Sequence, residues 1–92
     1  MYYLYFLKDN KADATFGPLL TCRNDAEATR YFRDLLGNKQ TLPGQHPQDF
    51  DLYCTASYDD ETGVTNWLNE ENDPVLIITG DTIHQLTLGT DK

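Results

Sequence analysis

The carboxylates and histidines of this sequence offer the first candidates for chemistry. Asp59, Asp60 and Glu61 are adjacent carboxylates, and carboxylate oxygens are the ligands that Ca²⁺ and Mg²⁺ prefer. Adjacent residues in a tight turn rarely converge on one ion, and the spacing of an EF-hand is absent. His46 and His84 have no cysteine or histidine partner at zinc-site spacing. We therefore expect no metal site and no cofactor.

The two cysteines are the second candidates. Cys22 and Cys54 could each pair with a histidine, but neither lies at a strand–turn–helix elbow of the kind that presents a nucleophile. They are too few for a disulfide framework, so we expect free thiols packed as small apolar side chains, with a bridge between them left open. Gly17 lacks the further glycines of a phosphate-binding loop. The sequence therefore predicts a protein that is not an enzyme.

Aromatic and basic residues could together bind single-stranded DNA, which needs stacking platforms beside a basic groove. The candidates are Tyr3, Tyr5, Arg23, Arg30 and Arg33. The net charge of −8 opposes such binding, because affinity for phosphates comes from Lys and Arg. The acidic residues are unevenly distributed along the chain. Residues 1–39 carry 5 acidic and 6 basic residues, whereas residues 40–92 carry 10 acidic residues and 1 basic residue. DNA contact is thus disfavoured overall and left open for the first part alone.

An acidic surface is expected in the second part of the chain. Its members are Asp59, Asp60, Glu61, Glu70, Glu71 and Asp73. Such a surface could act as a decoy that occupies the nucleic-acid site of a host protein. The plainer alternative is a solvated surface that keeps the protein in solution.

The elements that position these residues begin with an aromatic strand over residues 2–7. Side chains alternate along a strand, so Tyr3, Tyr5 and Leu7 share one face. Both faces are apolar, so both require cover, either in the centre of a helix-backed sheet or from a partner subunit. We therefore predict that Tyr3, Tyr5 and Leu7 form a partner or oligomer interface.

One helix is strongly marked, over about residues 25–36. Asn24 is a typical N-cap, and Glu27 follows at the capping-box position. Apolar residues recur at helical spacing and form one stripe: Ala28, Tyr31, Phe32, Leu35 and Leu36. Gly37 is expected to end the helix in the left-handed conformation.

The other predicted elements are short strands and turns. A strand over 14 to about 20 would lie at an edge or end early, because Gly17-Pro18 interrupts it. A loop over 38–49 leads to a strand over 50–58, whose Leu52, Cys54, Ala56 and Tyr58 would share a face. A turn at 59–63 and a return strand over 64–68 follow. The apolar run 75–79 is expected to be the most buried strand, and 83–88 is left as strand or short helix.

The predicted fold class is α+β: a single small domain, residues 1–92, with one helix packed on a mostly antiparallel sheet of four to six short strands. The apolar run at the N-terminus is far below the ~20 residues that span a bilayer, and it lacks the features of a secretory signal. We therefore expect a cytoplasmic protein that makes no membrane contact.

Four ordered motifs carry a resemblance to a known family. They are Phe16-Gly17-Pro18, Asn24 to Ala28 with Arg30 and Phe32, His46 to Tyr53, and Tyr58 to Gly63. In this order they resemble the small nonstructural protein of gokushovirus-type microviruses, which are single-stranded DNA bacteriophages, over roughly residues 1 to 65. The resemblance implies a role in viral DNA replication or packaging, a DNA-binding label for some members, and no catalytic residue.

These observations together predict a viral accessory protein that works mainly through protein contacts. Its partner would be itself, as a homo-oligomer, or another phage or host protein. The alternatives are direct binding of single-stranded DNA and the acidic decoy. The resemblance places the protein in the cytoplasm of the infected bacterium.

Overall fold

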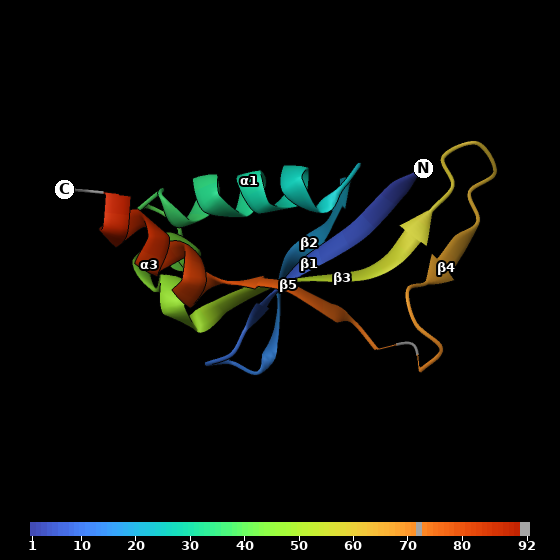
Figure 1. Cartoon of the computed structure of the whole chain (residues 1–92). Helices are drawn as coiled ribbons and strands as arrows, with labels where there is room; N and C mark the ends of the chain where they lie inside the picture. The colour runs from blue at the N-terminus through green and yellow to red at the C-terminus, as the bar shows by residue number, and fades with distance from the viewer. Residues whose placement is uncertain (72, 91–92) are drawn as a thin grey trace.

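Five strands and three helices make up the computed structural model, which describes residues 1–71 and 73–90 (Figure 1). The strands are β1 (Tyr2–Asp9), β2 (Ala14–Cys22), β3 (Phe50–Tyr58), β4 (Thr65–Trp67) and β5 (Val75–Thr79). The helices are α1 (Asp25–Leu36), α2 (Leu42–Gln45) and α3 (Gly80–Thr90), with a 3₁₀ turn η1 (Pro47–Asp49). All strand pairs are antiparallel, so the predicted α+β class is confirmed.

The sheet has the order β2-β1-β3-β4, and β5 also pairs with β3. β1 is hydrogen-bonded to β2 on one side and to β3 on the other, so of the two alternatives for covering this strand it takes the central position in the sheet. The far edge of β3 is shared: β4 pairs with residues 56–58 and β5 with residues 51–54. β3 therefore has neighbours on both sides along most of its length.

A β-bulge at Thr55 changes which side chains share a face. Tyr5 pairs with Cys54, but Leu4 pairs with Ala56, so Thr55 is an extra residue on β3. Because Leu4 and Tyr5 point to opposite faces, Cys54 and Ala56 do so as well. The predicted alternation, with residues 52, 54, 56 and 58 on one face, is therefore wrong beyond Cys54.

β2 is an edge strand, which is one of the two outcomes expected from Gly17-Pro18, and it does not end early but continues to Cys22. Its register with β1 shifts between Leu20, opposite Tyr5, and Phe16, opposite Leu7. Gly17 lies within this irregularity at φ +75°, a backbone conformation that favours glycine.

α1 has the predicted bounds because its first turn is capped. The Asn24 side chain accepts a hydrogen bond from the Glu27 N–H at 2.8 Å, and the Glu27 carboxylate accepts one from the Arg23 N–H at 3.4 Å. The predicted left-handed end is wrong: Gly37 has φ −79°, and its N–H donates to the Arg33 carbonyl at 3.0 Å.

Replacing the N-cap Asn24→Ala is expected to lower the free energy of unfolding by about 1 kcal/mol, because the Glu27 N–H loses its acceptor. Urea unfolding followed by circular dichroism measures the change. Asn24→Asp keeps a capping oxygen and is the control. Equal losses in the two variants would contradict the capping role.

The buried core lies between α1 and one face of the sheet. α1 contributes Ala28, Phe32 and Leu36. The strands contribute Tyr5, Leu7, Cys22, Phe50, Leu52 and Cys54. Phe16 packs edge-on against Phe50, with ring centroids 5.3 Å apart. The apolar stripe of α1 therefore packs against alternate residues of β1, β2 and β3 on one face of the sheet.

The C-terminal part differs most from its prediction. β5 is not the most buried strand, since Val75 is 38% and Leu76 is 48% exposed. Among the described residues it pairs with β3 alone, as an edge strand. The stretch left open as strand or short helix lies within α3, whose Ile83 is buried in the core. Residues 91 and 92 lie outside the described residues.

Gly80 starts α3 at a point where there is no room for a side chain. A Cβ there would overlap the carbonyl oxygens of Pro47 and Phe50. Gly80→Ala is expected to lower the free energy of unfolding by about 1–3 kcal/mol, because the backbone must shift. Gly37→Ala, where the nearest atom would lie 3.5 Å away, is the control and should be near neutral. Thermal unfolding of both variants tests this; equal melting temperatures would contradict it.

Candidate functional site

The helices and the buried core lie on one face of the sheet, and the other face is open. Figure 1 shows α1 and α3 packed on the same side. On the opposite side lies a hollow of about 310 Å³ lined only by strand residues: Leu4, Phe6, Thr15, Gly17, Leu19, Thr55, Ala56, Thr65 and Trp67. Within residues 1–71 and 73–90, no helix residue lines this hollow.

Large apolar side chains gather on this second face. We define the open face as Leu4, Phe6, Leu19, Tyr53, Trp67 and Leu76, which the strand registers and the lining of the hollow place together. Trp67 is 59%, Leu19 56% and Leu76 48% exposed. An apolar patch that continues across several strands is typical of a binding surface rather than of an ordinary solvated one.

The centre of the open face is an aromatic pair. The rings of Phe6 and Tyr53 are stacked, with centroids 5.3 Å apart and planes within 6° of parallel. They come from neighbouring strands, β1 and β3, whose register places the two residues opposite each other. Such cross-strand aromatic pairs contribute to sheet stability and hold both rings in a fixed orientation.

The predicted interface of Tyr3, Tyr5 and Leu7 requires correction. Tyr5 is fully buried and Leu7 is 4% exposed, because both lie in the core under α1. Tyr3 is partly buried beside the same core. On the other side of β1, Leu4 and Phe6 are partly exposed, so the apolar side chains that β1 leaves accessible lie on the face opposite to the predicted one.

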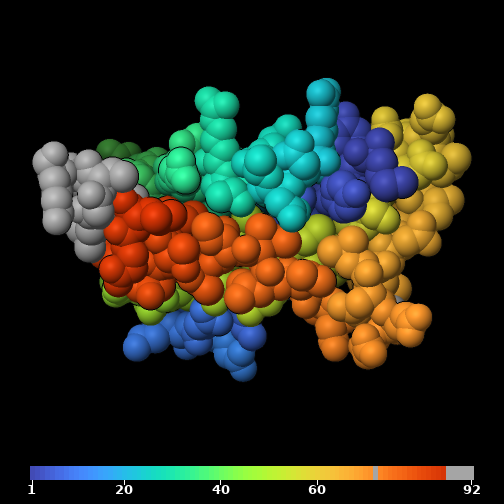
Figure 2. All heavy atoms as spheres, viewed as in Figure 1, coloured from blue at the N-terminus to red at the C-terminus, as the bar shows by residue number. Residues whose placement is uncertain are grey.

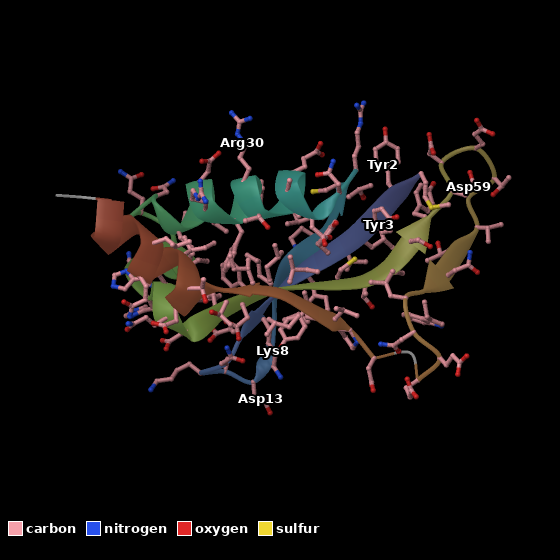
Figure 3. The ribbon with its side chains drawn as sticks, in the orientation of Figure 1. Tyr2, Tyr3, Lys8, Asp13, Arg30 and Asp59 are labelled. Carbon is pink, nitrogen blue, oxygen red and sulfur yellow. The ribbon has the colours of Figure 1, made fainter. Side chains whose placement is uncertain are left out.

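The predicted DNA-binding residues do not form one groove. Arg23, Arg30 and Arg33 are exposed, and Arg30 extends from α1 away from the sheet (Figure 3). Tyr5 is buried beneath α1 and cannot stack on a base. The arginines therefore lie on the helical side, where Tyr31 is the exposed aromatic residue of α1, whereas the Phe6, Tyr53 and Trp67 rings lie on the open face.

The predicted acidic residues lie in two segments at one end of the molecule. Asp59, Asp60 and Glu61 lie in the turn between β3 and β4; Glu70, Glu71 and Asp73 lie in the loop between β4 and β5. Figure 2 shows the yellow and orange parts of these segments together, at the end away from α3.

Two of these carboxylates make local contacts within the fold. Asp60 contacts the N-terminal ammonium at 3.2 Å. The pKa of Asp59 is lowered, chiefly because the Glu61 N–H donates to its carboxylate. Asp59 to Gly63 is thus also a structured turn, in which Gly63 has φ +80°.

The cysteines and histidines form no evident reactive site. Cys22 and Cys54 are free and buried, and burial raises the pKa of both thiols, which disfavours the nucleophilic thiolate. His46 and His84 line one pocket together with Asp49. In the described part of the chain, no three His, Cys, Asp or Glu side chains are grouped to hold a metal ion.

A second hollow, of about 550 Å³, lies on the helical side where α1 begins. Its lining includes Tyr3, Cys54, Leu68 and Val75. Next to it the Tyr5 hydroxyl donates to Asp25 at 2.7 Å, which ties the first turn of α1 to β1. The residues beside this hollow therefore have a structural role, since they hold the start of α1 against the sheet.

The residues of the open face were not predicted from the sequence as a site. The alternation of Leu4 and Phe6 was a usable signal for part of it. Leu76 and Trp67 join the face through pairings with Tyr53 and Ala56, which are far away in sequence. No local pattern could therefore have placed them there.

The protein is thus a small α+β domain in which helices cover one face of the sheet and leave the other, apolar face uncovered. The Phage ORF5 protein family matches the chain over residues 2–83, and the chain belongs to that family. It is therefore a phage protein, which agrees with the phage character of the resemblance noted from its motifs. Comparisons with curated proteins and with solved structures gave no significant match. No helix among the described residues is long and apolar enough to cross a membrane.

Proposed function

We propose that this phage protein is a non-enzymatic accessory factor of a gokushovirus-type microvirus that acts in DNA replication or packaging by binding protein. It would act in the cytoplasm of the infected bacterium. The observation that carries the proposal is the open face, with Trp67 59% exposed beside an apolar hollow. Aromatic residues in such a position are the usual anchors of protein interfaces.

Charge favours protein over DNA as the occupant of this face. Among the described residues, Lys8 is the only basic one that the strand registers place on the same side, and its ammonium lies 3.4 Å from the Asp13 carboxylate. Figure 3 shows these two residues at the hairpin between β1 and β2. A surface that binds phosphates needs several unpaired cations, and the described open face lacks them.

Co-purification tests the proposal. The native chain and Trp67→Lys are each expressed with a differently tagged copy of the chain and with every other protein encoded by the same phage. We expect the native chain to retain at least one of these proteins and Trp67→Lys to lose it, while Tyr31→Lys, on the helical side, retains it. If no protein is retained in a Trp67-dependent manner, the proposal fails.

Direct binding of single-stranded DNA is the second candidate, and the stacked rings of Phe6 and Tyr53 are the observation in its favour. A labelled oligonucleotide at low salt tests it. Binding that weakens steeply with salt and is lost in Phe6→Ala would support this candidate over the first. The acidic decoy predicts instead that a host nucleic-acid-binding protein is retained and is lost when Glu70 and Glu71 are neutralised.

A further inference from the structure

We infer that the open face binds the same face of a second copy, so that two sheets pack into a sandwich with their strands in opposite directions. The inference rests on the proposed function, because it names the partner of the proposed protein-binding surface. It follows from the shape, the size and the charge of the face.

The shape of the face is self-complementary. Trp67 and Leu76 project from the same edge of β3, one opposite Ala56 and the other opposite Tyr53. A two-fold axis across the middle of β3 would bring Trp67 of one copy over Leu76 of the other, and the reverse. The same axis would place the stacked Phe6 and Tyr53 rings of one copy over Leu4 and Ala56 of the other. Interfaces of this two-fold kind are the commonest in homo-oligomers.

The size of the face fits a reversible dimer. A strand of nine residues, such as β3, is about 30 Å long. Four strands side by side are about 19 Å wide, so the open face of the sheet has an area of roughly 570 Å². Stable complexes bury about 800 Å² per partner, and weak ones less. We therefore expect a dissociation constant in the micromolar range rather than a permanent dimer.

The charge decides the orientation. Strands running in the same direction would place the acidic ends of the two copies together, with Asp59 to Glu61 and Glu70 to Asp73 of both facing one another. Opposite directions place each acidic end near the partner's β1–β2 hairpin, where Lys8 and Lys11 balance Asp9 and Asp13. Like charges that face each other disfavour association, so the antiparallel arrangement is preferred.

Trp67 is the only tryptophan of the chain, so its fluorescence reports the state of the open face directly. On raising the concentration of the native chain from about 1 µM to about 1 mM, we expect dimer formation in sedimentation equilibrium and a parallel shift of the emission to shorter wavelength. Added salt should strengthen the dimer, since each copy carries −8 and repulsion is screened. A chain that stays monomeric over this range overturns the inference, and so does a dimer whose Trp67 emission does not change.

Variants test which face is used. Trp67→Lys and Leu76→Lys, both at exposed positions, should each raise the dissociation constant about 30-fold or more, and Tyr31→Lys on α1 should leave it unchanged. A dimer that survives both open-face variants overturns the inference. If the chain is monomeric but retains another phage protein through Trp67, the dimer is wrong while the proposed function stands. If the chain neither dimerises nor retains another phage protein, the dimer and the proposed function are both wrong.

Neutralising the acidic end tests the orientation. Replacing Glu61, Glu70 and Glu71 by glutamine should change the dissociation constant only severalfold or less if these ends lie apart. A tenfold or greater strengthening would show that the acidic ends meet, and would overturn the antiparallel arrangement.

Discussion

Phe32→Ala is expected to lower the free energy of unfolding by about 3–5 kcal/mol. Phe32 is fully buried and belongs to the cluster that joins α1 to Tyr5, Leu7 and Leu52. The truncation removes a ring and leaves a cavity in a core that few residues fill. A domain of this size has a total stability of about 5–13 kcal/mol, so the variant should be close to its folding limit. Urea unfolding at 25 °C measures the loss.

Tyr31→Ala is the matched control for this prediction. Tyr31 is the neighbouring aromatic residue on the same helix but is 46% exposed. Its truncation removes a ring of similar size with much less buried contact, so less than half the loss is expected. Similar losses in the two variants would mean that α1 does not bury Phe32 as described.

Alkaline pH is expected to destabilise the fold steeply from about pH 9 upward. Burial raises the pKa of the Cys22 and Cys54 thiols above the ordinary value of 9.0. Burial, together with the hydrogen bond to Asp25, raises the pKa of Tyr5 far above the ordinary value of 10.0. All three groups therefore keep their protons in the folded state at a pH where the unfolded chain releases them.

The sign follows from this difference. Each group's contribution is fully present below its unfolded pKa and is lost as the pH rises above it, at about 1.4 kcal/mol per pH unit. The two thiols contribute to this loss from about pH 9 and Tyr5 adds to it above pH 10, so the loss of stability should steepen there. Urea unfolding at pH 7, 9, 10 and 11 with a reducing agent measures it. Tyr5→Phe should flatten the curve above pH 10, and a curve parallel to that of the native chain would contradict the role of Tyr5.

Local signals predicted the elements whose boundaries are set locally. Asn24 and Glu27 cap α1 with their own side chains, and the bounds of α1 follow from that short segment. β3 was also predicted with its observed bounds, because turn residues flank it on both sides. Gly17-Pro18 likewise restricts β2 to an edge wherever the rest of the chain lies.

Long-range pairing decided what the sequence could not predict. The bulge at Thr55 exists only in the register between β1 and β3, and it reverses the face of Ala56. β5 is as apolar as a central strand, but its place at the edge depends on β4 occupying the other part of β3. The face of β1 was misassigned for a similar reason, since both of its faces are apolar and only the position of α1 distinguishes them.

The division of β3 between β4 and β5 also bears on aggregation. A long, regular strand at a sheet edge is a template on which further chains can add as strands and grow into fibres. Here one outer edge consists of two short strands of three and five residues, and the other, β2, is interrupted at Gly17-Pro18. A chain with an exposed apolar sheet face would otherwise be prone to ordered polymerisation. Its edges resist strand addition, so the sheet can leave one face uncovered with less risk of fibre growth.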